Sequence, residues 1–244
     1  MERDYDTEAR DHPEHRYAYD FDYRMHRYMM RAFGPLAMDG PALELGCYHG
    51  HFTRLLCERF TDVDVVEASA ECITQAREAT QGRAQFTHAR FEEFTPSRAY
   101  ANIFLIHTLE HLDERAAMLA RIGGWLAPGG RLFVATPNAH AGSRQIAVKM
   151  GLITHAAAVT PAELAHGHRV TYSLDTLHAD IRAAGLRSVW HGGLFFKGLA
   201  NFQIDAALKA GVISDAYLDG CYELGHTYPD LCSSIYHVCA RPAA

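Results

Sequence analysis

Apolar and polar positions follow two alternating periods along most of this 244-residue chain. Short apolar runs suited to buried strands stand between stretches in which apolar residues recur every three or four positions, as on one face of a helix. This pattern predicts strands at 42–45, 63–69, 84–91, 101–109 and 131–138, with helices at 51–60, 71–80 and 113–126. Strands and helices that alternate at this pace predict right-handed βαβ units and a parallel sheet.

The last third of the chain keeps this alternation but is interrupted twice. The pattern predicts one more helix and two more strands, at 173–186, 187–196 and 233–240. Ser173 is the expected N-terminal cap of that helix. The segments 138–168 and 197–228 break the pattern. Because open α/β sheets bind ligands beyond the carboxyl ends of their strands, we expect both segments to cover a substrate.

The first 34 residues differ from the rest, since they are rich in Tyr, Arg and His. Their apolar residues adopt helical spacing toward the end, and Gly34 and Pro35 stop the pattern, so residues 1–34 are expected to form a helical arm. Residues 40–137 hold the regular strands and form the expected cofactor-binding core. A chain of this length has an ordinary size for one α/β fold, so we expect a single domain over residues 1–244.

The composition limits the partners and the compartment. Hydrophobic residues make up 48% of the chain and the net charge is -6, which is typical of a globular protein and gives no reason to expect a nucleic-acid partner. No apolar run approaches the roughly 20 residues that span a bilayer, and the polar N-terminus lacks a signal-peptide core. The six cysteines form no CxxC pair. We expect a cytoplasmic protein without membrane contact.

The stretch ALELGCYHGHF, residues 42–52, resembles the glycine-rich turn of a nucleotide-binding fold. A dinucleotide turn needs GxGxxG, whereas here Glu44 precedes Gly46 and Gly50 and no third glycine follows. The Glu44 carboxylate would repel phosphate but suits an ammonium and a sulfonium. Glu67, at the end of the next strand, is placed to accept hydrogen bonds from ribose hydroxyls. The two acids together predict S-adenosylmethionine (SAM) as the ligand.

Four segments carry a family resemblance in the expected order: LELGCYHGHFTRLL, VEAS, NIFLIHTLEHL and LAPGGRLFVATPN. They resemble the motifs of class I SAM-dependent methyltransferases, closest to the ubiquinone-biosynthesis type, and the later HGHRVTYSLDTLHADIRAAGL fits the same group. The resemblance covers residues 42 to about 190. It implies an α/β fold with a doubly wound, mostly parallel seven-stranded sheet whose last strand is antiparallel, and methyl transfer as the activity.

The resemblance also implies a set of cofactor-binding residues. They are Glu44, Gly46, Cys47, Tyr48, Gly50, Glu67, Ala68, Phe91, Glu92, Ile106 and His107. Glu67 would bind the ribose, and Ala68, Phe91 and Glu92 would surround the adenine. Family members usually have glycine where Tyr48 stands, so the tyrosine must point away from the cofactor or lie across it. Arg24 of the arm would pair with the methionine carboxylate.

Two groups of histidines are candidates for the chemistry. His107 and His111 follow the fourth strand, four residues apart, and would share a face on a helical turn. Either one could serve as a general base, or the pair could only organise the loop. His166 and His168 alternate in a strand-like stretch and would point the same way, toward substrate or in structural hydrogen bonds.

A metal site is the third possibility for the first group. His107, Glu110 and His111, with a distant His166 or His168, are similar to the divalent-metal site of small-RNA 2'-O-methyltransferases. His107 replaces the first glutamate of that pattern, which shifts the preference from magnesium toward softer ions. SAM is therefore the expected cofactor, and a divalent metal is a less favoured addition to it.

The sequence thus predicts SAM-dependent methyl transfer to an oxygen or nitrogen of a small molecule, such as a secondary metabolite, sugar or nucleotide-sugar. The alternatives are metal-assisted 2'-O-type methyl transfer and a SAM-binding protein without methyl transfer. An NAD-linked oxidoreductase is disfavoured, because the third glycine of its fingerprint is absent and Glu44 is present.

Overall fold

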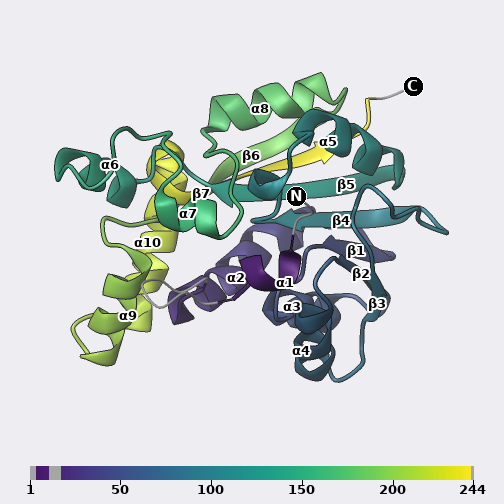
Figure 1. Cartoon of the computed structure of the whole chain (residues 1–244), viewed down its shortest axis with the longest axis horizontal. Coiled ribbons are helices and arrows are strands. Elements are labelled where there is room, and N and C mark those ends of the chain that lie inside the picture. The colour runs from purple at the N-terminus through teal and green to yellow at the C-terminus, as the bar shows by residue number, and fades with distance from the viewer. Residues whose placement is uncertain (1–3, 11–17, 243–244) are drawn as a thin grey trace.

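A seven-stranded sheet organises the computed structural model, which describes residues 4–10 and 18–242 (Figure 1). The strands are β1 (Ala42–Leu45), β2 (Val63–Glu67), β3 (Gln85–His88), β4 (Tyr100–Ile106), β5 (Leu126–Pro137), β6 (Arg187–Phe196) and β7 (Cys232–Ala240). The helices are α1 (Tyr5–Glu8), α2 (Asp20–Phe33), α3 (His51–Arg59), α4 (Ala70–Thr80), α5 (Arg115–Gly124), α6 (Gly142–Lys149), α7 (Pro161–Ala165), α8 (Leu174–Ala183), α9 (Asn201–Lys209) and α10 (Asp215–Thr227). Short 3-10 helices occupy Gly34–Leu36, Leu109–His111 and Pro229–Leu231.

The strand order confirms the predicted doubly wound sheet. It runs β3-β2-β1-β4-β5-β7-β6, and β7 is antiparallel to both of its neighbours while the other pairs are parallel. The chain leaves β1 toward one edge and returns at β4 on its other side. In an open sheet of this kind the crevice at that reversal, outside the carboxyl ends of the strands, is where ligands bind. The carboxyl ends of β1, β2 and β4 are therefore the expected place for a site.

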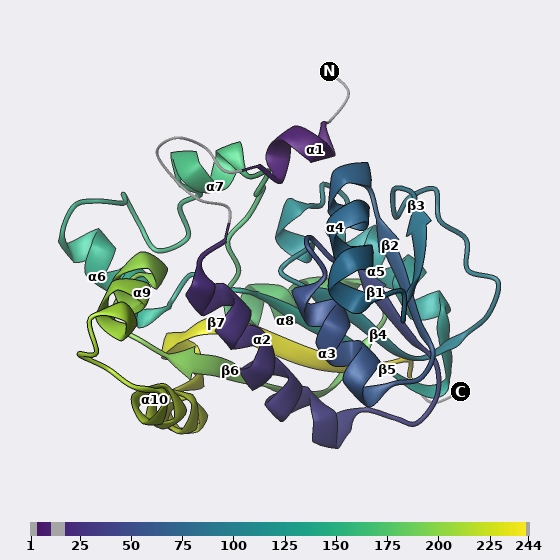
Figure 2. The same ribbon diagram turned by 90° about the horizontal axis from the view of Figure 1, so that it is seen from below.

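Helices cover both faces of the sheet, and each face has its own apolar core. One core joins α2, α3 and α10 to the sheet and contains Phe104 stacked on Phe133 with ring centroids 4.7 Å apart. The other joins α5 and α8 to the opposite face. Figures 1 and 2 show the two helical layers with the strands between them. Buried strands with helices on both faces explain the continuous apolar runs of the sequence.

The cap of α8 agrees with the prediction, whereas the start of β5 differs from it. Ser173 caps α8 as predicted, since its side chain accepts a hydrogen bond from the amide of Thr176. The expected start of the fifth strand at residue 131 is too late, because β5 already pairs at Leu126 with Tyr100. An irregularity in this pairing and the positive φ of Gly129 (+76°) let the strand continue through the predicted turn.

The two interrupting segments are helical rather than irregular. Residues 138–168 contain α6 and α7, and residues 197–228 contain α9 and α10. Figure 1 shows α6 and α7 together at one end of the sheet. No helix among the described residues is long and apolar enough to cross a membrane.

The arm contains two helices in its described part. α2 buries Phe21, Met25, Met29 and Phe33 and ends where Gly34 and Pro35 begin a 3-10 turn, as predicted. α1 lies away from α2, between α4 and α7 (Figure 2). Asp6 of α1 accepts a hydrogen bond from Ser69 at 2.5 Å, and Arg10 pairs with Glu71 of α4 at 2.8 Å. Through these contacts the first part of the arm lies at the β2–α4 side of the β1–β4 crevice.

Candidate active site

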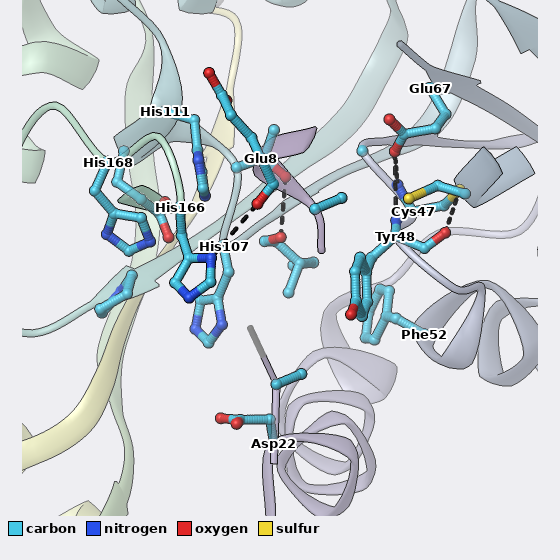
Figure 3. A pocket seen from close by; sticks show the side chains of 18 of the residues that line it. Glu8, Asp22, Cys47, Tyr48, Phe52, Glu67, His107, His111, His166 and His168 are labelled. Atoms are coloured by element: carbon cyan, nitrogen blue, oxygen red, sulfur yellow. Dashed lines mark hydrogen bonds between the residues drawn. The ribbon is translucent and has the colours of Figure 1, made fainter. Parts of the chain in front are cut away.

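A cavity of about 490 Å³ lies at the reversal between β1 and β4. Its walls come from the carboxyl ends of β1, β2 and β4, the arm, α7 and the start of β7. Figure 3 shows His107, His111, His166 and His168 on one side, with Cys47, Tyr48 and Glu67 facing them. The predicted cofactor residues and the predicted histidines thus line one cavity.

Glu44 is buried in the wall of this cavity. Its side chain is 1% exposed and belongs to β1, with the cavity beside it. Burial raises the pKa of the carboxyl to about 8 against the opposing effect of the Thr53 hydroxyl, and the nearby charge of Glu67 adds to the rise. No described residue donates a hydrogen bond to its Oε2 atom. A buried carboxyl with an unpaired oxygen is costly, so this position fits a cationic group of a ligand.

Glu67 holds the glycine loop in place. Its Oε2 accepts from the amides of Cys47 at 2.9 Å and Tyr48 at 3.3 Å, and its Oε1 accepts from the amide of Ser69 at 2.9 Å. A carboxylate offers about four acceptor positions, so these three bonds leave capacity for a ligand hydroxyl. The sequence predicted the ligand contact but not the support that Glu67 gives to the loop.

Three residues of the loop have backbone conformations that favour glycine. Gly46 has φ +80°, and a side chain there would meet Thr108 Oγ1 at 2.7 Å. Gly50 has φ +77° and starts α3, but it packs against Ala76 of α4 and is not among the residues that line the cavity. Tyr48 adopts φ +46° in spite of its side chain. Tyr48 therefore adopts a backbone conformation that usually favours glycine.

Tyr48 lines the cavity, and its ring stacks on that of His49 with centroids 3.6 Å apart. Phe52 lines the same wall, as Figure 3 shows. Of the two positions that the sequence allowed, the tyrosine takes the one at the cavity. Its ring forms part of the wall, and the cavity remains open beside it.

The end of the cavity predicted to hold adenine lies beyond β2. Ala68, Phe91 and Glu92 line it as predicted, together with Cys72 and Arg90. Arg90 Nε lies 3.6 Å from Glu92, so the two charges face each other. The predicted residues Cys47, Ile106 and His107 also line the cavity, nearer its centre.

The structure does not bring Arg24 to the cavity. Its guanidinium donates to Asp215 at 2.6 Å, which joins α2 to α10. Tyr23 and His26 line the cavity instead. These two residues are three apart on the helix and share a face, while Arg24 is turned about 100° away from Tyr23.

The arm contributes side chains that the sequence analysis did not single out. Asp22 is half-buried in the wall, and the loss of solvent around its carboxyl raises its pKa. Its oxygens accept from the Tyr19 amide at 2.8 Å and from Asn201 of α9 at 2.7 Å. His26 is also half-buried, and the loss of solvent around its ring lowers its pKa to about 3. The run YDFDYRMH was the available signal, because polar residues at helical spacing beside Phe21 and Met25 mark a half-buried face.

His107 follows β4 with φ +48°, a left-handed conformation that is uncommon outside glycine and often marks functional sites. Its Nε2 lies 2.9 Å from the hydroxyl oxygen of Ser234 in β7. Burial lowers the pKa of His107 to about 4, and the charge of His168 acts in the same direction. The ring is therefore neutral near pH 7 and able to accept a proton. The expected helical turn shared with His111 is wrong, because the chain reverses here before the 3-10 helix begins.

Glu110, His111 and His168 form a cluster in which one ligand atom of each side chain lies within 4.8 Å of the others. The rings of His111 and His168 meet edge to face at 4.5 Å. Glu110 is 1% exposed, and burial raises its pKa to about 8. No described side chain donates a hydrogen bond to its carboxyl oxygens, and only its own backbone amide interacts with them. His107, the predicted third member of a metal site, is not in this cluster; His168 takes that place.

The expected strand-like stretch around His166 and His168 is wrong. α7 ends at Ala165, and Gly167 turns the chain with φ +84°. The amide of His168 then donates to the Glu163 carbonyl at 2.9 Å. Both histidines line the cavity from this helix end. A capping box starts α7, with Thr160 and Glu163 bonded reciprocally, and this sequence signal could have predicted the helix.

The charges around the cavity are one-sided. Its described lining contains seven acidic residues and five histidines, whereas Arg90 is the single basic residue among them. Arg144 and Lys197 are not among the lining residues, and both are already bonded, Arg144 to Glu163 of the lining at 2.7 Å and Lys197 to the Leu199 carbonyl at 3.0 Å. The described walls therefore favour cationic or neutral ligands over anionic ones.

Comparison with known families gives one match over most of the chain. A family model described as a methyltransferase domain matches residues 15–191. Among curated proteins, the trans-aconitate 2-methyltransferase of Methylobacterium radiotolerans is 37% identical over 106 residues. That match covers 43% of this chain and 40% of the relative, so the chain spans less than half the length of the curated relatives it matches.

Solved structures share the fold at low sequence identity. The CcbJ methyltransferase of Streptomyces caelestis superposes with a TM-score of 0.62 at 16% identity, covering 99% of this chain and 100% of that one. The N-methyltransferase NodS of Bradyrhizobium japonicum, solved with S-adenosylhomocysteine, gives a TM-score of 0.56 at 13% identity, covering 91% and 87%. The architecture predicted from the sequence is thus that of known methyltransferases.

Proposed function

Because the chain belongs to the methyltransferase domain family, we propose that it transfers a methyl group from SAM to an oxygen or nitrogen of a small molecule. The acceptor is held at the histidine side of the cavity, under the cover of α7 and the arm. Methyl transfer is the activity that the names of its relatives also carry. The substrate named for the curated relatives, trans-aconitate, is a tricarboxylate, and the cavity walls offer it little basic charge.

The observation that carries the proposal is the pair of acids at the ends of β1 and β2. Glu44 has a buried oxygen without a donor, and Glu67 keeps acceptor capacity beside the loop. A ligand with a cationic amino-acid part and a ribose satisfies both positions. A dinucleotide would bring a pyrophosphate toward Glu44, which would cost electrostatic energy. The residues present therefore fit SAM.

SAM supplies a methyl group on a good leaving group, so this chain has to orient the acceptor and take up its proton. Correct orientation contributes up to about 7–11 kcal/mol in model reactions. We assign proton uptake to His107, since its neutral ring lines the cavity and its Nε2 lies beside Ser234. A base whose pKa lies near the working pH adds about 10²–10⁴-fold to the rate, and the lowered pKa of His107 places its contribution at the low end of that range.

A metal-assisted reaction is a second candidate, favoured by the cluster of Glu110, His111 and His168. Two imidazoles and a carboxylate suit first-row transition ions, which could orient an acceptor hydroxyl. If this candidate is correct, a chelator abolishes turnover and one ion per chain restores it.

Thermal unfolding with added ligands tests the main proposal. SAM and S-adenosylhomocysteine at about 100 times their dissociation constants are expected to stabilise the protein by about 2.7 kcal/mol. A domain of this size would then melt roughly 5–10 °C higher. NAD at the same concentration should leave the melting temperature unchanged. Stabilisation by NAD, with none by SAM or its product, would reject the proposal.

A further inference from the structure

We infer that the acceptor is an amine, whose ammonium group binds at Glu110 between His111 and His168. This inference rests on the proposed function and names its substrate class. The starting observation is the state of Glu110, which is 1% exposed and lines the cavity, while no described side chain donates a hydrogen bond to its carboxyl oxygens and only its own backbone amide interacts with them. A buried carboxyl without donors is destabilising, and a cationic ligand removes that cost.

The geometry of the cluster fits an ammonium group. An ammonium has three N–H donors at tetrahedral angles, and acceptors about 2.9 Å from its nitrogen lie about 4.7 Å apart. Glu110, His111 and His168 each present one atom, and because these atoms all lie within 4.8 Å of one another, a single nitrogen can reach all three. A neutral imidazole nitrogen and a carboxylate oxygen are both acceptors, so the three side chains match the three donors.

The surrounding charges exclude the alternative of an anionic acceptor. The single basic residue of the described lining, Arg90, faces Glu92 at the other end of the cavity. Arg144 behind α7 is held by Glu163 and by the Ala156 carbonyl at 2.5 Å. An anionic acceptor next to Glu110 would oppose ionisation of that carboxyl and would have no basic side chain of the described lining to pair with there.

Methyl transfer moves positive charge from the sulfur of SAM to the acceptor nitrogen, which lies next to Glu110 in this arrangement. One proton of the bound ammonium passes through His107, the base assigned above, to solvent, which leaves a neutral amine. Its nitrogen lone pair then forms the N–CH₃ bond while the C–S bond breaks and its electron pair stays on sulfur. The positive charge passes from sulfur to nitrogen, so a carboxylate beside that nitrogen stabilises the transition state. An oxygen acceptor would pass through a developing oxyanion, which the same carboxylate opposes.

Matched sets of probes test this inference. We suggest tyramine, tyrosol and 4-hydroxyphenylacetate as one set and glucosamine, glucose and glucuronate as another, with trans-aconitate as an additional anion. Each set keeps its scaffold and changes an amine to a hydroxyl or a carboxylate. Dissociation constants are measured by calorimetry on protein saturated with S-adenosylhomocysteine, in buffer containing a chelator. At least one amine should bind about 10-fold or more tightly than both of its partners, and trans-aconitate should not bind.

Variants connect the preference to Glu110. Glu110→Gln keeps the size of the side chain and removes its charge, so it should fold and lose about 30-fold or more of the amine affinity. Glu114→Gln, a neighbouring change at an exposed position, should keep the preference. Binding of SAM to both variants is measured in the same samples, since this separates the inference from the proposed function.

Three results would overturn the inference. The first is that no amine binds more tightly than its hydroxyl and carboxylate partners. The second is that the amine preference persists in Glu110→Gln. The third is turnover of hydroxyl probes that requires a divalent ion and disappears in Glu110→Gln, which would assign the cluster to a metal. Normal SAM binding beside any of these leaves the proposed function intact, whereas loss of SAM binding in the unmodified protein rejects the function itself.

Discussion

Replacing Glu67 with alanine is expected to weaken SAM binding by about 100-fold or more, which corresponds to about 2.7 kcal/mol. Two causes add. The ribose hydroxyls lose their acceptor, and the amides of Cys47, Tyr48 and Ser69 lose the carboxylate that fixes the glycine loop. The unpaired amides should also lower the free energy of unfolding by about 1–3 kcal/mol. Calorimetry and denaturant unfolding measure the two effects.

The matched control is Glu58→Ala, on the exposed side of α3, where Glu58 pairs only with Arg54 one helical turn away among the described residues. An exposed pair of this kind contributes about 0.3–0.5 kcal/mol, and no change in SAM affinity is expected. Equal affinities for the Glu67→Ala variant and the unmodified protein would show that the ribose does not bind at the end of β2.

Replacing Glu44 with glutamine is expected to remove a pH dependence of SAM binding. Burial holds the pKa of Glu44 near 8 in the ligand-free protein, so the carboxyl is mostly protonated at pH 6. The cationic ligand prefers the ionised form, and binding must release the proton. Between pH 6.0 and 7.5 the ionised fraction, and with it the affinity, should rise about 20-fold. In Glu44→Gln the profile should be flat and the affinity lower.

Stability of the ligand-free protein should respond in the opposite direction. Folding raises the pKa of Glu44 from about 4.5 to about 8. Between these two pH values Glu44 is protonated in the folded protein but ionised in the unfolded chain. The contribution of Glu44 to stability is therefore lost as pH rises from about 4.5 to 8. Calorimetry of SAM binding in buffers of different ionisation enthalpy measures directly whether a proton is released when SAM binds. An affinity that does not change with pH in the unmodified protein would contradict the placement of the cation at Glu44.

The sheet could be predicted because its elements are coded locally. Strands β1, β2 and β4 are buried on both faces, so their apolar runs stand out in the sequence. α8 begins at a standard cap, Ser173. Helices α6 and α9 of the two interrupting segments are different, since α6 buries none of its residues and α9 buries only Ile204 among the described residues. With so little burial they lack the strong periodic pattern on which helix prediction depends.

Residues of the site were predictable where one local motif places them. Glu44, Gly46 and Glu67 lie at strand ends and turns, where chain direction alone brings them to one edge of the sheet. His107 and His168 could not be placed in this way. The left-handed backbone at His107 separates it from His111, and the turn at Gly167 brings His168 across the cavity to Glu110. Contacts between elements that are 60 residues apart depend on tertiary packing, which a single sequence does not display.

Calorimetric titration of ligand-stripped protein with SAM, and then with S-adenosylhomocysteine, tests the account most directly. We expect each compound to bind at one molecule per chain with a dissociation constant in the range of about 1–100 μM, or about −8 to −5.5 kcal/mol. Both should release heat at pH 7.5, where Glu44 begins to ionise. A protein that stays folded and shows no heat with either compound at millimolar concentration would contradict the claim that two acids at the β1–β2 edge hold a cationic methyl donor.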